Sequence, residues 1–226
     1  MSAVAGAKVV LSIDVGGTSV KVRTSEVEEV RKHPSGPELT PASMVAAVRE
    51  MTADWDYDAI SIGFPGPVVN GSPAVEPRNL GPGWVGFDFE KAAGKPVRVI
   101  NDAAMQALGS YDGGKMLFLG LGTGLGSAIV IAGQAEPLEL AHLPYRKDRS
   151  YEDYLGKHGL KRLGAEKWEQ HVHTVVELFK NALLVDYVVL GGGNAKKLKA
   201  IPEGARLGAN ANAFLGGFRI WDSRSD

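Results

Sequence analysis

The sequence predicts an α/β protein with mixed sheets, and three observations lead to this fold class. Two strand-like segments at the start are joined by a glycine turn, which is the signature of a hairpin (Lys8 to Val15 and Thr18 to Thr24). Strands and helix-like segments then follow one another, but not as a plain alternating βαβ chain, which favours mixed sheets. A second pair of glycine-joined strands near the middle repeats the opening (Met116 to Leu121 and Gly126 to Ile131). Two similar halves that face each other would leave a cleft, and clefts favour ligands.

The elements of the first half each carry a local signal. Pro41 to Ala53 is helix-like, with Thr40 placed as its cap and Pro41 at the first helical position. Ala59 to Phe64 is a buried strand that ends at a Pro-Gly-Pro sequence. The stretch Val69 to Gly86 is rich in Gly, Pro and Asn, so we expect a long functional loop or small strands with wide turns. Val97 to Asn101 is a strand and Ala103 to Leu108 a helix.

The second half continues the same pattern. A short helix is expected at Tyr151 to Lys157, and a strand from Asp186 to Leu190 ends at three glycines. Asn194 to Lys199 is predicted to start a helix, and Asn210 to Leu215 to form a last one. The clearest helix is amphipathic, because its apolar residues recur at intervals of three and four (Trp168, Val172, Val175, Phe179 and Leu183).

Composition narrows the function classes. The chain has 226 residues and a formal net charge of −1, so no broad attraction to nucleic acid or to an anionic membrane is expected. No apolar run approaches the roughly 20 residues that span a bilayer. The apolar N-terminus leads straight into Asp14, and we interpret it as the first strand and not as a signal peptide. Cysteine is absent, which excludes disulfides and thiolate zinc sites and fits a cytoplasmic location.

Two glycine turns are candidate phosphate sites. DVGGTSVK (Asp14 to Lys21) and LGTGLGS (Leu121 to Ser127) each place glycines between two strands. Such a turn lets several backbone N–H groups point at one anion, and Thr18 and Thr123 add hydroxyl donors. Asp14 could hold a water of a magnesium shell. Either turn alone could equally be an ordinary hairpin. Both together, with a third glycine run at Gly191, Gly192 and Gly193, favour a nucleotide or polyphosphate site.

Asn101 and Asp102 stand where a buried strand meets a helix, in VRVINDAAMQALG. Asp before AAMQAL is a good helix cap, and taken alone this interpretation is favoured. A carboxylate at that position is also held by backbone N–H groups and by the helix dipole, which favour its ionised form. It could then accept a proton from an attacking hydroxyl. Beside the two glycine turns, we prefer the second interpretation.

Six motifs in order resemble the ROK family of sugar kinases: DVGGTSVKV, GFPGPV, NDAAMQALG, LGLGTGLGSAIV, LELAH and LGGGN. The resemblance runs from about Val9 to Trp221. It implies the two-lobed actin-like, hexokinase-type (ribonuclease H-like) ATPase fold with a cleft between the lobes. The expected lobes are residues 1–101, with 209–226 packing back on them, and residues 102–208.

The resemblance also implies site roles. Asp102 matches the catalytic base, and the sugar would be bound by Asn79, Asn101, Glu139, His142 and Glu152. Phosphate or nucleotide would be bound by Asp14, Gly16, Gly17, Thr18, Lys21, Gly122, Thr123, Gly124, Gly191, Gly192 and Gly193. Mg²⁺ is expected as cofactor, held by Asp14 through water. A homodimer is expected as well, without nucleic acid or membrane partners.

The chain departs from the family pattern at the zinc site. Most members carry one His and three Cys after the Glu–His pair, whereas RKDRSYEDYLGKHGL stands here. We therefore expect no structural zinc. Short, cysteine-free relatives with a YED-like stretch resemble polyphosphate glucokinases, which use polyphosphate as well as or instead of ATP. The basic residues Lys157, Lys161, Arg162, Lys196, Lys197 and Lys199 could flank a long anionic donor, although a solvated helix face explains each of them better.

The predicted function is therefore a kinase that transfers a phosphoryl group from ATP or polyphosphate to the 6-hydroxyl of a hexose, with glucose as the leading substrate. Two alternatives stay open. One is a non-catalytic sugar-binding sensor on the same fold. The other is a kinase for another acceptor, such as mannose or an N-acetylated amino sugar.

Overall fold

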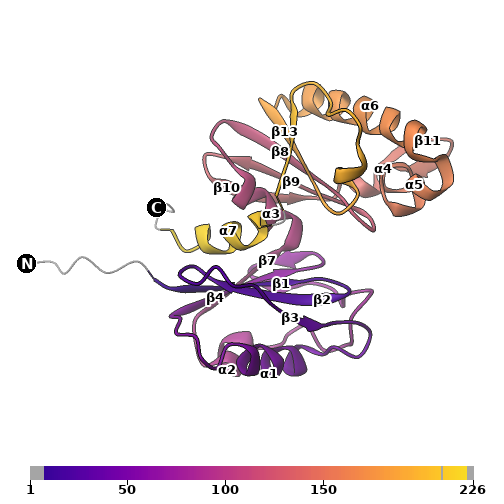
Figure 1. The fold of residues 1–226 in the computed structure, drawn as a ribbon. Helices are drawn as coiled ribbons and strands as arrows, with labels where there is room; N and C mark the ends of the chain where they lie inside the picture. Colours follow the sequence, from indigo (N-terminus) through magenta and orange to yellow (C-terminus); the bar gives the residue numbers. More distant parts are fainter. Residues whose placement is uncertain (1–7, 210, 223–226) are drawn as a thin grey trace, which may run out of the picture. The chain divides into compact units, whose positions relative to one another are not determined.

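The computed structural model describes residues 8–209 and 211–222, and the chain divides into two compact units. The first unit runs to Asp102 and takes up the chain again from Ala213, and the second is Ala103–Asn212. Each unit is built around its own five-stranded sheet (Figure 1). The termini of the predicted first lobe (1–7 and 223–226) and Asn210, predicted to begin the last helix, lie outside the described residues.

The sheet of the first unit has the order β3-β2-β1-β4-β7. Its strands are β1 (Val10–Val15), β2 (Ser19–Thr24), β3 (Arg31–Pro34), β4 (Ala59–Phe64) and β7 (Val97–Asn101). β1, β2 and β3 pair antiparallel, whereas β4 pairs parallel with both β1 and β7. Asp14 is in register with Gly63, and Gly63 with Ile100. The carboxyl ends of three parallel strands therefore meet at one edge, and they place Asp14 and Asn101 there.

Helices cover both faces of this sheet (Figure 1). On one face lie α1 (Pro41–Met51) and α2 (Phe89–Ala93), and α1 starts at Thr40 with the predicted cap, closed by Ser43. Leu11 and Ile13 of β1 pack in a core with Met44 of α1. Ser12 lies between them in sequence and faces α7 (Asn212–Arg219), because strand side chains alternate. The small hairpin β5 (Val68–Val69) and β6 (Ser72–Pro73) lies in the stretch predicted as loop or small strands.

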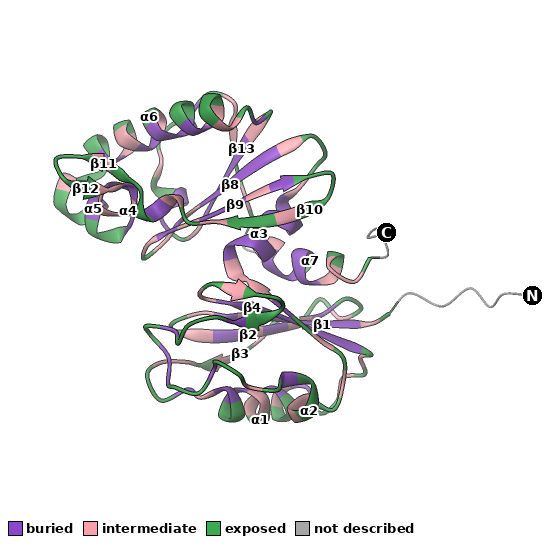
Figure 2. Ribbon diagram, turned by 180° about the vertical axis from the view of Figure 1, so that it is seen from behind, coloured by how far each residue is buried: buried purple, intermediate pink, exposed green. Residues whose placement is uncertain are grey.

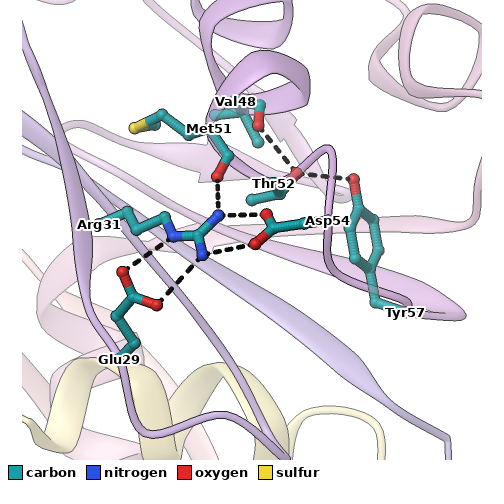
Figure 3. Close-up of polar contacts among 7 residues, drawn as sticks. All are labelled: Glu29, Arg31, Val48, Met51, Thr52, Asp54 and Tyr57. Atoms are coloured by element: carbon teal, nitrogen blue, oxygen red, sulfur yellow. Dashed lines mark hydrogen bonds and ion pairs between the residues drawn. The ribbon is translucent and has the colours of Figure 1, made fainter.

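An arginine cluster, which the sequence analysis did not predict, fastens β3 to the end of α1 (Figure 3). The Arg31 guanidinium donates to both oxygens of Glu29 at 3.1 Å, to the Met51 carbonyl at 2.6 Å, and to Asp54. These bonds hold the pKa of the Glu29 and Asp54 carboxyls below their usual values. Thr52, the residue after Met51, makes a separate contact, because its hydroxyl donates to Val48 O at 2.8 Å. These contacts tie Arg31 to the segment that follows α1, while β3 itself forms by pairing with β2.

The second unit repeats the sheet arrangement of the first, in the order β10-β9-β8-β13-β14. Its strands are β8 (Lys115–Leu121), β9 (Leu125–Ile131), β10 (Gln134–Leu138), β13 (Tyr187–Gly191) and β14 (Ala205–Leu207). β8, β9 and β10 are antiparallel, and β13 pairs parallel with β8 and β14. The hairpin joining β8 and β9 carries Gly122–Gly124, as the hairpin joining β1 and β2 carries Gly16–Thr18.

The helices of the second unit are α3 (Asp102–Ser110, of which Ala103 onward belongs to this unit), α4 (Tyr151–Leu155), α5 (Lys157–Leu163) and α6 (Ala165–Leu183). The long helix α6 buries the predicted apolar stripe against one face of the sheet, and its outer side is exposed (Figure 2). A further hairpin joins β11 (Pro144–Arg146) and β12 (Arg149–Ser150). Single 3₁₀ turns lie at Leu140–His142 and Ala195–Lys197.

The helix predicted from Asn194 to Lys199 is wrong, because only the turn Ala195–Lys197 forms. Leu198 is extended (φ −66°, ψ 129°), which ends the turn. Two contacts with the rest of the unit hold this path. Asn194 N donates to Leu121 O at 2.8 Å, and Glu169 of α6 accepts from the amides of Lys199 and Ala200. Tertiary hydrogen bonds thus satisfy the amides that a helix would have used. In the described part of the chain, no helix is long and apolar enough to cross a membrane.

Candidate active site

The predicted site residues divide between the two units, and five of them lie at the glycine turn between β1 and β2. Asp14 at the end of β1 is in register with Lys21 of β2, and Lys21 Nζ lies 3.0 Å from Asp14 Oδ2. The turn itself closes when Gly16 N donates to Ser19 O at 3.1 Å. Gly17 and Thr18 are exposed. The turn therefore presents backbone to solvent, with one carboxylate and one ammonium at its base.

Ser35 secures this turn from outside, and the sequence analysis did not name it. Its backbone N–H donates to Thr18 O at 3.2 Å, and its hydroxyl donates to Gly16 O at 2.5 Å. Ser35 directly follows β3, which was not predicted as a strand. Recognising a strand that pairs with Thr18 to Thr24 would have placed Ser35 beside the glycine turn. Because two carbonyls of the turn are held, its N–H groups keep a fixed direction.

Asn79 lies beside the same turn. A Cβ built on Gly17 would be 3.5 Å from the Asn79 Cβ and 3.8 Å from its amide nitrogen, which is ordinary contact. The resemblance assigned Asn79 to the sugar and Gly17 to the phosphate. The structure brings the two residues together, from segments about sixty positions apart in the chain.

Asn101 and Asp102 lie at the same edge of the sheet, two strands from Asp14. Asn101 Nδ2 donates to Gly66 O at 3.1 Å, which fixes the end of β7 to the turn after β4. Adjacent strands are spaced by about 4.8 Å, so Asp14 and Ile100 are about 10 Å apart between Cα atoms. β7 runs into α3 without a loop, and the helix begins at Asp102 itself. The carboxylate thus belongs to the first helical turn, where exposed N–H groups favour a negative charge.

In the second unit, hydrogen bonds from two other segments hold the glycine turn between β8 and β9. Gly122 N donates to the carbonyls of Gly120 and Gly124, both at 3.1 Å. Gly122 O accepts from Asn194 Nδ2 at 2.8 Å and from Lys157 N at 3.1 Å. Asn194 is 8% exposed, so this is a buried clamp. Sequence reasoning quoted Asn194 within LGGGN but gave it no role. A polar residue directly after a glycine run at a strand end was the available signal.

Glu152 is brought to this turn as well. Its Oε2 accepts from Leu125 N at 3.3 Å, the residue that starts β9 directly after Gly124. A Cβ on Gly124 would overlap the Glu152 carboxylate and lie 3.1 Å from its Cδ. Glycine at 124 is therefore what lets the carboxylate approach the turn. Glu152, which the resemblance assigns to the sugar, thus lies against Gly124, which it assigns to the phosphate.

Glu139 and His142 form a pair in the 3₁₀ turn that follows β10. His142 Nε2 lies 3.4 Å from Glu139 Oε2, and both side chains are more than half exposed (62% and 61%). The turn connects to α4 because Tyr151 N donates to Leu143 O at 3.2 Å. Tyr151 precedes Glu152, so the three predicted sugar residues of this unit lie in neighbouring segments.

An aromatic cluster occupies the region where the family pattern has its cysteines. Tyr145 stacks on Tyr151 at 4.7 Å between ring centroids and meets Tyr154 edge-on at 5.1 Å. Tyr145 Oη lies 3.1 Å from His171 Nδ1. Burial, with the Arg146 charge next, lowers the pKa of His171, and burial raises the pKa of Tyr145. The cluster supports α4, whose start is capped by Ser150 and Asp153, and so fixes the segment that carries Glu152.

The three glycines after β13 have separate structural reasons. A Cβ on Gly191 would meet the Phe118 ring at 2.5 Å, and one on Gly192, which has φ +81°, would meet the Leu121 backbone at 2.6 Å. Packing alone therefore requires glycine at these two positions. Gly193 is exposed and its Cβ would meet nothing within 4 Å among the described residues. Of the three positions, only 193 has a glycine that packing does not require, so contact with a ligand is an available explanation for glycine there.

The expected Mg²⁺ was tested against the residues present. Within residues 8–209 and 211–222 no group of three or more His, Cys, Asp or Glu side chains could enclose a metal ion. Magnesium in phosphoryl-transfer sites usually keeps several waters and takes one or two carboxylates plus phosphate oxygens. Asp14 has one oxygen engaged by Lys21 and is partly exposed, so it fits a contact through water.

A family model and several curated proteins match this chain. The family model described as "ROK family" matches residues 10–136. A polyphosphate glucokinase of Mycobacterium tuberculosis is 25% identical over 215 residues, covering 82% of this chain and 77% of that protein. The bifunctional enzyme NanE/NanK of Brucella melitensis is 32% identical over 139 residues, or 55% of this chain. The chain spans only 27% of the length of that relative.

A solved structure also matches over nearly the whole chain. The inorganic polyphosphate/ATP-glucomannokinase of Arthrobacter sp. strain KM superposes with a TM-score of 0.78 at 22% identity, covering 93% of this chain and 97% of that one. At this identity the likeness shows the fold. Together with the two mixed sheets, it confirms the predicted fold class, the actin-like hexokinase fold.

Proposed function

This chain belongs to the ROK family, and on that premise we propose that it is a sugar kinase. It transfers a phosphoryl group from ATP or inorganic polyphosphate to the 6-hydroxyl of a hexose, with glucose as the leading acceptor. One observation carries the proposal: each unit holds a clamped glycine hairpin, and Asp102 stands in the first turn of α3 at the strand edge that also carries Asp14. The names of two similar proteins, a polyphosphate glucokinase and a polyphosphate/ATP-glucomannokinase, support it.

Asp102 is the proposed general base. The 6-hydroxyl oxygen of the sugar forms a bond to the terminal phosphorus while the bridging P–O bond of the donor breaks. The hydroxyl proton passes to the Asp102 carboxylate and from there to solvent. A positioned base contributes typically 10²–10⁴-fold to such a step. Asp102 lies in the first turn of α3, where exposed backbone N–H groups favour a negative charge, as a base requires.

The glycine turns are the proposed phosphate contacts. Phosphoryl transfer is catalysed mainly by positioning and by neutralising charge, and fixed backbone N–H groups provide both. In the first unit Ser35 fixes the turn, and in the second unit Asn194 does. A bound Mg²⁺ would supply further neutralisation of phosphate charge, held by Asp14 through water.

The polar side chains Asn79, Asn101, Glu139, His142 and Glu152 are the proposed sugar contacts. Sugar hydroxyls donate and accept at once, and amide, carboxylate and imidazole groups match both roles. Glu139 and His142 are paired and exposed, so they are accessible to a ligand.

The experiment is a donor-by-acceptor panel. The purified chain is incubated with Mg²⁺, with ATP or polyphosphate, and with glucose, mannose or N-acetylmannosamine, and sugar phosphate is measured by ³¹P NMR. We expect phosphorylation of glucose at C6 with at least one of the two donors. Phosphorylation of the N-acetylated sugar alone would replace glucose as the proposed acceptor. Glucose binding by calorimetry without any phosphoryl transfer would favour the non-catalytic sensor.

A further inference from the structure

The carboxylate of Glu76 accepts hydrogen bonds from three consecutive backbone amides. Its Oε2 accepts from Gly83 N at 3.0 Å and from Trp84 N at 3.1 Å, and its Oε1 accepts from Val85 N at 3.2 Å. Successive N–H groups that converge on one point form an anion site, and here a side chain of the same chain fills it. Glu76 thereby closes a loop that begins at its own position and ends at Val85.

The loop closed by Glu76 carries Asn79. On either side of Asn79 the chain is anchored in the core of the first unit, because Pro77 and Leu80 are buried and Trp84 is fully buried. Gly81 N donates to Leu39 O at 3.0 Å, and a Cβ on Gly81 would lie 3.1 Å from the Leu39 backbone. Asn79 itself is exposed and lies against Gly17. The exposed amide thus stands on a loop that is anchored on both sides of it.

We propose that Glu76 is a positioning residue that holds Asn79 in the place where it contacts the sugar. The inference rests on the proposed function, which assigns Asn79 to the sugar. Both carboxylate oxygens are used, and ionised acceptors make stronger hydrogen bonds than neutral ones. A glutamine has one acceptor oxygen and would turn an N–H donor toward at least one of the three amides. The loop would then loosen while the core beneath it stays packed.

Glu76→Gln should raise KM for the sugar about tenfold and leave kcat within about twofold, because a contact made equally in the ground state and the transition state affects KM alone. Asn79→Ala should do the same. The double variant should be no worse than Asn79→Ala, because Glu76 acts only through Asn79. Glu26→Gln, at an exposed glutamate of the same unit, is the matched control and should leave both constants unchanged.

Additive effects of the two substitutions, or an unchanged KM in Glu76→Gln, would overturn the proposal. If Glu76→Gln does not fold, Glu76→Asp replaces it in the comparison with Asn79→Ala and the double variant, because it keeps the charge on a side chain one methylene shorter. If the wild-type chain has no kinase activity, the proposed function fails separately. The sugar Kd from calorimetry then replaces KM in the cycle, and unchanged affinity in Glu76→Gln overturns the inference.

Discussion

Gly124→Ala is the substitution that tests how the second glycine turn and Glu152 depend on each other. The new methyl group would overlap the Glu152 carboxylate and lie 3.1 Å from its Cδ. A Cβ has no room there, so the Glu152 side chain must swing away. It then loses the hydrogen bond from Leu125 N, which is 3.3 Å long.

The magnitude follows from that bond. A hydrogen bond to a charged group contributes about 1.5–3 kcal/mol, and its length places this one at the lower end. About 1.4 kcal/mol corresponds to a factor of ten in binding. If Glu152 binds the sugar from its position on the turn, restoring that position on binding costs about the free energy of the lost bond, so Gly124→Ala should raise KM for glucose about tenfold.

Gly122→Ala is the matched control for this prediction. It adds the same methyl group two positions earlier in the same turn, and that methyl would meet no other described atom within 4 Å. The assay is steady-state glucose phosphorylation with both variants, accompanied by thermal unfolding to confirm that each is folded. Equal KM values in the two variants would refute the reasoning, as would a Gly124→Ala variant indistinguishable from wild type.

Two further predictions concern stability and pH. Gly217→Ala should lower the free energy of unfolding by about 1–2 kcal/mol in urea denaturation, because its Cβ would lie 2.8 Å from the Ser12 Cβ and this overpacking outweighs the better helix propensity of alanine. Adding Ser12→Gly to this variant should restore part of the lost stability. Strictly additive effects of the two substitutions would contradict the explanation. The pKa of His171 is lowered below 6.5 in the folded chain, so the unfolded chain binds the proton more readily. The stabilising effect of the neutral imidazole is therefore fully present above pH 6.5. It should be lost as the pH falls through 6.5 toward the lower pKa of the folded chain. His171→Phe should flatten the melting temperature between pH 8 and pH 5, and an unchanged slope would show that His171 is not the group responsible.

Most of the scaffold was predictable because its signals are local. Ala59–Phe64 and Val97–Asn101 are short runs rich in Ile and Val that are flanked by Pro or Asp, and the structure gives the same bounds. The helix from Pro41 has its cap written in the sequence at Thr40. The strand Arg31–Pro34 was missed because most of its residues are polar. It is held by its pairing with β2 and by the contact of Arg31 with Asp54, 23 positions away, and both contacts are tertiary.

The supports of the candidate site were not predictable, because they are tertiary. Motif resemblance pointed to the glycine turns and to the polar residues beside them. It gave no indication that Ser35 and Asn194 hold the turns, or that Glu76 closes the loop of Asn79. Each of these is a side chain bonded to the backbone of a distant or looped-back segment, and spacing in the sequence does not record such bonds. The failed helix at Asn194 shows the same limit, since its amides are used by other segments.

The turnover of Asp102→Asn with glucose and the preferred donor tests the central claim most directly. Asparagine keeps the shape of the side chain and its place in the first turn of α3, but it cannot take up the proton of the 6-hydroxyl. We expect glucose to bind with a Kd within about twofold of wild type, while kcat falls by about 10²–10⁴-fold. A variant that binds glucose normally and turns over at close to the wild-type rate would contradict the assignment of Asp102 as the base.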